Sequence, residues 1–477
     1  MKKGFILFLT PLLIGCSISP NPGPIDPPDP PDPPGPITDL DVFDDEDKLY
    51  NSFFSYTSKI EIKLKFTNQA IYKLAQYGIS GYFDKEEMYH PCEATFTIND
   101  VSKTFSGVGA RMKGNTSRDG GFVSEDGYFT DSERKCHFKL SFKETFEDTD
   151  YYSETFESQE AKEARKDRRF GGMKKLDFKW NKNYDYSFTK EAYANYCLND
   201  VGVAAQKTNL ISLTVESDVD SFTQEYLAME AVDKPMLKKQ LGKDQKDGDL
   251  YKCLYPANLV GVGSYGVESA NFKPRYAIKT NEDTTDHSNL LNFLNTINKK
   301  GPVSTMKSEI DSVVDVDYFL RYSAIMWVIG NPDDMRNNTN NTYLYFSNKT
   351  NKMIPIPYDN DRCFGILKDW NIDTSNVPCT TTKRVGANRE WNENPLLWRL
   401  IISENSSVSY SDNYPVISEY KTQYEKYCAE YATKYLNVEK YENFTNQFYY
   451  SNKDISNPGV DNMTFETYAK AKLATLK

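Results

Sequence analysis

Asparagine and aspartate are concentrated in two stretches of the chain, GNPDDMRNNTNNTYLYF at 330–346 and PIPYDNDRCFG at 355–365. The oxygen-bearing side chains of interest are Asp333, Asp334, Asn341, Asp359 and Asp361. Carboxylate and amide oxygens suit a hard cation such as Mg²⁺. An acid beside such a metal can orient or deprotonate a hydroxyl group. The alternative is that these residues simply fill turns, as Asn and Asp often do.

The elements around these stretches would bring the side chains together. Residues 311–330, DSVVDVDYFLRYSAIMWVIG, have the pattern of a strongly buried helix that runs into the loop with Asp333 and Asp334. Residues 341–346 and 353–359 predict a hairpin whose mouth carries Asn341 and both later aspartates. Protein kinases divide comparable roles among a catalytic Asp, a metal-binding Asn and a second, metal-binding Asp.

The rest of the chain predicts strands first and helices later. Alternating apolar residues predict strands at 59–66, 93–100, 103–113, 137–142, 211–215 and 225–230. Helical spacing predicts helices at 188–201, 283–300, 415–436 and 464–476. The charged stretch 144–170 is expected to be a solvated insertion. Because no regular βαβ alternation is present, the predicted class is α+β, with an N-terminal antiparallel sheet and a more helical C-terminal part.

Composition excludes several kinds of function. The net charge of −11 argues against a nucleic-acid binder, which normally presents a basic surface. Only three histidines occur, His90, His137 and His287, and none is paired at metal-ligand spacing, which argues against zinc and against Ser-His-Asp or Cys-His hydrolysis. Without Cys16, seven cysteines remain and no C-x-x-C pair occurs, so most are expected to be small core residues, with one or two bridges left open.

The N-terminus reads as a secretion signal. Lys2 and Lys3 precede a short apolar run, which is too short to span a membrane, and Leu13-Ile14-Gly15-Cys16 resembles the bacterial lipobox. The resemblance implies cleavage after residue 15 and a diacylglycerol on the sulfur of Cys16. An ordinary cleaved signal with a chance cysteine is the alternative. No second apolar run approaches the length of a membrane span.

A proline-rich segment then separates this anchor from the rest of the chain. Residues 16–37 include NPGPIDPPDPPDPPGP, which predicts an extended polyproline II spacer, or disorder of the same composition. Residues 38–477 would form the folded domain. The expected location is the outer face of a bacterial membrane, at the cell surface.

Several blocks of sequence resemble the CotH-like (spore coat protein H) kinase family, in the family's order along the chain. PYDNDRCFG is similar to the family's PWDxDxxFG, NTNNTYLY to its HNYYLY strand, and NPDD to its N-x-D. Upstream, GARMKGNTSR resembles G-x-R-x-R-G-N-S-S-R, and CHFKLSF resembles P-Y-K-L-K-F. Further blocks match at YDYSFTKEAYANYCLNDVGVAA, YLAMEAVDKPML, DLYK and NPLLWRLI. The resemblance covers residues 60 to about 435.

The resemblance implies an atypical protein-kinase-like fold that binds ATP with Mg²⁺, and it assigns roles to particular residues. Lys139 would contact ATP phosphates, and Glu230 would pair with it, face the nucleotide pocket, or be a surface strand residue. Arg111 and Lys113 would touch phosphate or belong to an exposed strand face. Asp333 or Asp334 would orient the substrate hydroxyl. Asp359, with Asp361 beside it, would hold Mg²⁺, and Asn341 would be a supporting metal or structural residue.

Three positions depart from the family pattern. Tyr358 replaces the family tryptophan, Asn340 replaces the histidine before Asn341, and Lys113 replaces the second arginine of R-x-R, which loses bidentate geometry. None removes a candidate metal carboxylate. The function implied is an ATP/Mg²⁺-dependent phosphotransferase that acts on Ser or Thr hydroxyls of an unknown protein. The alternative is a non-catalytic surface module for adhesion or assembly, to which a Tyr- and Asn-rich surface would be suited.

Overall fold

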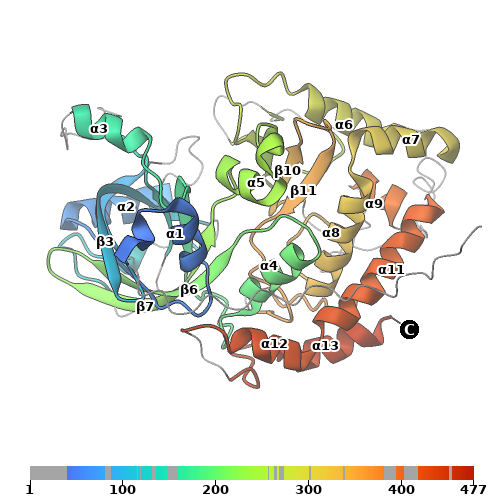
Figure 1. The fold of residues 1–477 in the computed structure, drawn as a ribbon. Coiled ribbons are helices and arrows are strands. Elements are labelled where there is room, and N and C mark those ends of the chain that lie inside the picture. The colour runs from blue at the N-terminus through green and yellow to red at the C-terminus, as the bar shows by residue number, and fades with distance from the viewer. Residues whose placement is uncertain are drawn as a thin grey trace, which may run out of the picture. The chain divides into compact units, whose positions relative to one another are not determined.

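A closed barrel of seven strands forms the first half of the chain (Figure 1). The computed structural model describes residues 40–80, 88–114, 117–118, 120–130, 136–147, 152, 159–255, 257–262, 266–267, 273–299, 302–336, 339–368, 370–380, 394–401, 417–450 and 454–476. Around the barrel the strands are β1 (Ile60–Lys65), β2 (His90–Ile98), β3 (Val101–Lys113), β4 (His137–Ser141), β5 (Lys175–Lys179), β7 (Ser221–Glu230) and β6 (Thr208–Glu216). The described residues all belong to one compact unit, which begins at Pro36.

Strand pairing is antiparallel except where the barrel closes, because β1 runs parallel to β6. The predicted early strands and the β6–β7 pair are therefore confirmed. The predicted N-terminal antiparallel sheet is present in β1 to β4, and closure into a barrel, with its one parallel pair β1–β6, was not predicted. β5 was not predicted, although it joins β4 to β7 and completes the barrel.

Side-chain alternation gives the barrel an apolar interior and a polar outer face on β3, β4 and β5. Phe138 and Leu140 of β4 and Leu176 and Phe178 of β5 are fully buried in the interior cluster. Residues between them point to the other face. Across the strands, Arg111 pairs with Lys139, Lys139 with Asp177, and Lys113 with His137. The barrel thus presents a row of cationic side chains on its outside.

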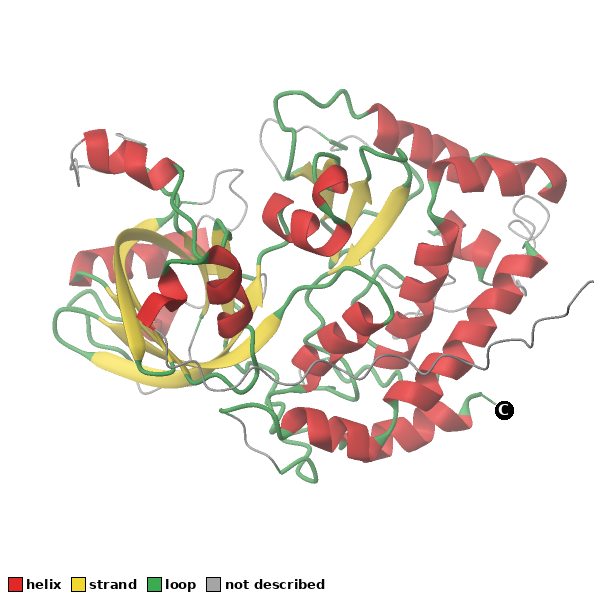
Figure 2. Cartoon of the chain, in the orientation of Figure 1, coloured by secondary structure: helices red, strands yellow, loops and turns green. Residues whose placement is uncertain are grey.

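Helices dominate the second half of the chain, as the α+β class predicts (Figure 2). The central helix is α8 (Val316–Ile329), which is buried along most of its length and packs against α11 (Ser418–Tyr435). The other helices after the barrel are α5 (Lys234–Leu241), α6 (Ser288–Asn298), α7 (Val303–Val313), α9 (Pro395–Leu400), α12 (Val438–Thr445) and α13 (Phe465–Ala474). A four-stranded sheet has the order β11 (Met353–Pro357), β10 (Thr342–Phe346), β8 (Asp249–Cys253) and β9 (Tyr276–Ile278).

Several predicted boundaries change in the structure. The buried helix expected at 311–330 begins only at Val316, because Asp315 caps it by accepting a hydrogen bond from the Tyr318 amide, and residues before it belong to α7. The helix predicted at 188–201 is α4 (Lys190–Asp200). The hairpin predicted around the acidic residues is β10–β11 and is confirmed. The insertion at 144–170 contains a short helix, α3 (Gln159–Lys166).

Helix α13 supports the end of α8. The Tyr468 hydroxyl of α13 donates to the Val328 carbonyl at 2.9 Å, and the Lys472 ammonium donates to the Thr374 carbonyl at 2.6 Å. Thr374 in turn donates through its hydroxyl to the carbonyl of Gly330 at 2.6 Å. The residue that ends α8 is therefore held by a segment that α13 fixes in place.

Cysteines behave as the sequence predicts for most positions. Among the described residues the free thiols are Cys92, Cys136, Cys197, Cys253, Cys363, Cys379 and Cys428, and all but Cys379 are buried. Within the described part of the chain, no helix has both the length and the apolar character needed to cross a membrane. The predicted signal, Cys16 and the linker lie outside the described residues.

Candidate active site

The outer face of the barrel carries a buried group of opposite charges centred on Asp177 of β5. This carboxylate is fully buried, and its two oxygens contact Lys113 Nζ and Lys139 Nζ, each at 2.9 Å. Burial alone would raise the pKa of Asp177, but the two ammonium groups outweigh burial and hold that pKa below its ordinary value. Asp177 is therefore ionised at neutral pH and fixes both lysines.

Arg111 and Lys113 also contact aromatic rings. The Arg111 guanidinium lies 5.3 Å from the centre of the Tyr89 ring, and Lys113 Nζ lies 5.3 Å from that of Tyr358. Both distances are within the range of a cation–π contact. The cationic row therefore reaches Tyr358, the residue immediately before Asp359.

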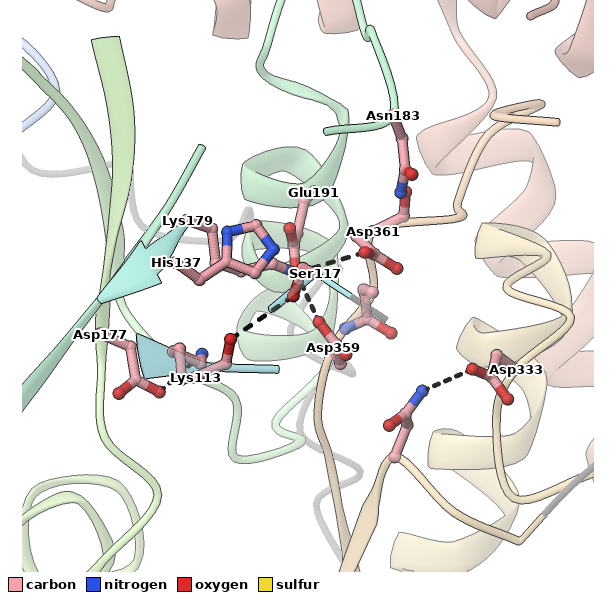
Figure 3. Close-up of polar contacts among 12 residues, drawn as sticks. Lys113, Ser117, His137, Asp177, Lys179, Asn183, Glu191, Asp333, Asp359 and Asp361 are labelled. Carbon is pink, nitrogen blue, oxygen red and sulfur yellow. Dashed lines mark hydrogen bonds and ion pairs between the residues drawn. The ribbon is translucent and has the colours of Figure 1, made fainter. Parts of the chain in front are cut away.

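Lys179, two residues beyond Asp177 on β5, connects the barrel to the acidic loop (Figure 3). Its ammonium lies 2.8 Å from Glu191 Oε1, 2.5 Å from Asp359 Oδ1 and 3.8 Å from Asp361 Oδ2. Glu191 is in the first turn of α4, and both aspartates follow β11. One ammonium therefore joins a strand, a helix and a loop that are far apart in the sequence.

Charges in this group shift one another's pKa values. Burial opposes ionisation of Lys179, but Asp359, Asp361 and Glu191 together raise its pKa well above the ordinary value. Burial would raise the pKa of Asp359, yet Lys179 and Lys113 lower it. Burial, with Asp359 close by, raises the pKa of Asp361. Lys179 and Asp359 therefore stabilise each other's charged forms.

His137 is a buried, uncharged neighbour of these ionised side chains. Its Nδ1 accepts a hydrogen bond from the Trp180 amide at 3.1 Å, and burial, aided by Lys179 and Lys113, places its pKa well below the ordinary value. The imidazole is therefore neutral. Asn183, in the loop between β5 and α4, donates to the Asp361 carbonyl at 2.9 Å and holds the acidic loop against the barrel.

The end of α8 positions the other acidic stretch. Gly330 ends the helix in the left-handed conformation, with φ +67°, and a Cβ there would lie 2.0 Å from the Tyr468 hydroxyl. Asn331 follows and makes a bridge: its Oδ1 accepts from the Asp333 amide at 3.0 Å, while its Nδ2 donates to the Asp359 carbonyl at 3.2 Å. The two acidic stretches are thus joined by one asparagine side chain.

Asn341 makes a second bridge between them. Its Nδ2 donates to Asp333 Oδ2 at 2.9 Å, and its carbonyl accepts from the Tyr358 amide at 3.0 Å. Asn341 and Asp359 both adopt positive φ angles, 52° and 61°. Such conformations carry strain in residues other than glycine and are concentrated at functional sites. The structure places Asn341 against Asp333, with its backbone beside the acidic loop.

Asp333 and Asp334 have different surroundings. Asp333 is partly exposed and is held by Asn331 and Asn341. Asp334 is 1% exposed and forms an ion pair with Arg336 at 2.7 Å. Arg336 also donates to the Met326 carbonyl of α8 at 2.9 Å. Asp334 therefore fastens its loop to α8, and Asp333 is the aspartate left facing the site.

Glu230 is not brought together with Lys139. Glu230 of β7 lies beside Leu176 of the neighbouring strand β5, whose side chain is interior, whereas Lys139 lies beside Asp177 on the outer face. Glu230 is 1% exposed, and burial raises its pKa to about 7. Lys139 was expected to pair with Glu230 but pairs with Asp177 instead. Alternate residues of a strand point to opposite faces, so Glu230 and Lys139 lie on different faces of the barrel wall.

Three residues that the sequence did not single out therefore make ion pairs with the predicted site residues or with one another: Asp177, Lys179 and Glu191. The signal for the first two was present in KLDFK, residues 175–179, where polar and apolar residues alternate. Glu191 is in a helix that the sequence predicted, but no pattern in the sequence indicated its partner.

The oxygen donors fit Mg²⁺ in the way that phosphate-transferring sites usually hold it. Asp359 and Asp361 converge on the same cation, the Lys179 ammonium. In the described ranges, no group of three or more His, Cys, Asp or Glu side chains is arranged to hold a metal ion alone. Mg²⁺ is commonly bound by one or two carboxylates together with substrate phosphates and water, rather than by a cage of protein ligands.

Comparison with known families matches residues 111–451 to the family described as CotH kinase protein. The chain belongs to the CotH kinase family. The CotH match covers well over half of the chain and contains all of the charged residues of the site, although Tyr89 and Tyr468 lie outside it. It begins at Arg111 of β3, and so leaves out β1 and β2, which the resemblance in the sequence had included. A search of curated proteins found no match.

CotH membership gives the site a chemical context. A kinase family implies phosphoryl transfer, a reaction that needs positioning and charge neutralisation more than covalent chemistry from the protein. The CotH chain described here provides a cationic strand face, a pair of carboxylates that share one ammonium, and a separately held aspartate. These groups meet where the barrel, α4 and the loop after β11 come together.

Proposed function

We propose that this protein transfers the γ-phosphate of ATP to a Ser or Thr hydroxyl of a protein, with Mg²⁺. The observation that carries the proposal is the contact of one strand lysine, Lys179, with a helix glutamate, Glu191, and a loop aspartate, Asp359. Protein kinases require a strand-lysine–helix-glutamate pair and a metal-binding aspartate to be in place together. Here β5, α4 and the loop after β11 supply the three in the same chain order, which supports a kinase-like arrangement.

Each residue has a role that follows from its surroundings. Asp359 and Asp361 would hold Mg²⁺, which when bound neutralises charge on the transferring phosphate. Lys179, freed from Asp359, would bind phosphate oxygens while Glu191 retains it. Arg111, Lys113 and Lys139 would make the neighbouring surface positive, with Asp177 holding the two lysines in place.

Asp333 would accept the proton of the substrate hydroxyl. The hydroxyl oxygen forms a bond to the γ-phosphorus, the bond from that phosphorus to the β,γ-bridging oxygen breaks, and ADP leaves. Asn331 and Asn341 would keep the Asp333 carboxylate in position, since they hold its backbone and one of its oxygens. An acid held in this way contributes by orientation as well as by accepting the proton.

The rival function, adhesion or assembly without catalysis, has less support. Many tyrosines lie in the core. Of the described residues, the well-exposed tyrosines are Tyr128, Tyr186, Tyr255 and Tyr449, and they lie in four separate loops. Asp359 is also held in a charged network rather than left alone. A binding surface rich in tyrosine is therefore not favoured by the described residues.

Transfer of labelled γ-phosphate by the purified full-length chain tests the function. We expect Mg²⁺-dependent transfer to the chain itself or to a protein acceptor, and a loss of about 10³-fold or more in Asp359→Ala, because metal stabilisation of the transition state contributes several kcal/mol. Asp100→Ala, which removes an exposed carboxylate in the turn between β2 and β3, is the matched control. Transfer that survives in Asp359→Ala, or is absent from the wild-type chain, would contradict the proposal.

We also propose that the protein is exported and anchored by a lipid on Cys16. The signal-like residues before Cys16 and the proline-rich spacer after it support this location. Labelled palmitate fed to cells that express the chain should be incorporated into the wild type and not into Cys16→Ser. The variant should be released from the membrane fraction. Equal labelling of the two chains would rule out the anchor.

A further inference from the structure

The Lys179 ammonium lies among the carboxylates of Asp359, Asp361 and Glu191, a position that would also suit a metal cation (Figure 3). We propose that this ammonium and a divalent cation exchange at the two aspartates, and that Glu191 holds the ammonium when the metal is bound. The proposal rests on the proposed function for its purpose. It concerns cation binding, however, and can be tested without nucleotide.

The charges of the group divide into two balanced sets. Lys179 and Glu191 form an ion pair of zero net charge at 2.8 Å. Asp359 and Asp361 together carry two negative charges, which equal the charge of one divalent cation. In the structure the single ammonium is shared by both sets, because it lies within ion-pair distance of all three carboxylates. When a metal ion binds the two aspartates, the ammonium would lose its contacts with them and keep its ion pair with Glu191.

The exposure of the side chains indicates from which side a metal ion would approach. Lys179 and Glu191 are 4% and 10% exposed, whereas Asp359 and Asp361 are 32% and 26% exposed. A cation from solvent therefore meets the aspartates first, and the ammonium lies behind them beside its buried partner. The ammonium need not leave the protein, since a small rotation of the flexible lysine side chain separates it from Asp359.

Two substitutions should change metal affinity in opposite directions. Lys179→Met removes the competing ammonium, so divalent cations should bind more tightly. Glu191→Gln removes the alternative partner of the ammonium, which should then stay on the aspartates and weaken metal binding. If Glu191 acts through Lys179, its substitution should have no further effect once the lysine is gone. Glu191 would thus be a positioning residue, which acts on the metal through Lys179.

Binding of Mn²⁺ to the full-length chain, measured from the electron paramagnetic resonance of the free ion without nucleotide, tests this scheme. We expect Lys179→Met to tighten binding about tenfold or more, since opposite charges in contact at a partly buried site interact by more than the equivalent of a tenfold change. Glu191→Gln should weaken binding several-fold, and the double variant should match Lys179→Met within about twofold. Lys139→Met, which removes a lysine of the same barrel face whose ion pair is with Asp177, should change affinity less.

The opposite results are equally specific. Unchanged or weaker binding in Lys179→Met would overturn the exchange. An equal effect of Glu191→Gln with and without the lysine would show that Glu191 acts on the metal directly, and would overturn its assigned role. If Lys179→Met folds poorly, the rise in melting temperature on adding Mn²⁺ should still exceed that of the wild type. A chain that shows this pattern and transfers no phosphate would contradict the proposed function alone.

Discussion

Asp333→Asn should lower the rate of phosphoryl transfer by about 10²–10⁴-fold, the range expected when a general base is removed. The amide cannot accept the proton of the substrate hydroxyl, although it keeps the size of the carboxylate. Asn331 and Asn341 contact the Asp333 backbone and one side-chain oxygen, and both contacts can persist. We therefore expect ATP affinity, Mn²⁺ affinity and the melting temperature to remain close to those of the wild type. Single-turnover transfer measured beside thermal melting checks this.

The neighbouring aspartate provides the matched comparison. Asp334→Asn leaves the Arg336 guanidinium without its charged partner in a site where Asp334 is 1% exposed. We expect a lower melting temperature in that variant, with transfer falling only as the folded fraction falls. If Asp334→Asn instead abolished transfer at full stability while Asp333→Asn did not, the two roles would have to be reversed.

Asp177→Asn should destabilise the protein by about 3–5 kcal/mol, the cost expected when one partner of a buried ion pair is removed. The change leaves Lys113 and Lys139, whose side chains are 8% and 16% exposed, beside each other without a counter-charge. Urea unfolding of the full-length chain at neutral pH measures the effect. Asp100→Asn, at an exposed turn, should change the free energy of unfolding by less than about 0.5 kcal/mol.

The stability difference between the wild type and Asp177→Asn should depend on pH in a predictable direction. The pKa of Asp177 is lower in the folded protein than in the unfolded chain, so its stabilising contribution is present above roughly pH 4 and is lost as the pH falls toward the folded value. The difference in stability between wild type and Asp177→Asn should therefore shrink in acid. A difference that stays constant down to pH 3 would show that lost packing, rather than lost charge, explains the variant.

Local patterns in the sequence were enough to find most of the scaffold of the site. The buried helix, the β10–β11 hairpin and the strands that carry Arg111, Lys113 and Lys139 were all predicted, because each has a clear apolar period over its own length. The break before Val316 was missed, since an aspartate cap within a long apolar run resembles an exposed position on one continuous helix.

Partners across the barrel could not be predicted in the same way. β5 is five residues long and follows a charged insertion, so its alternation was overlooked, and with it Asp177 and Lys179. The pairing of Lys139 depends on which strand lies beside β4 and on which face each residue occupies. Both are properties of barrel closure, which involves strands distant in the sequence. The resemblance to a family pointed to the acidic loop after β11, but not to Lys179, which contacts that loop.

The support of α8 by α13 has a consequence for how the protein is made. Tyr468 and Lys472 belong to α13. They hold the Val328 carbonyl and, through Thr374, the Gly330 carbonyl at the helix end from which Asn331 and Asp333 follow. A nascent chain that has emerged only as far as α12 already contains Lys179, Glu191 and Asp359, but the loop that carries Asp333 still lacks its support. The loop that carries Asp333 therefore gains this support only after α13 has been synthesised, and a chain truncated before residue 465 should be unable to form the complete site.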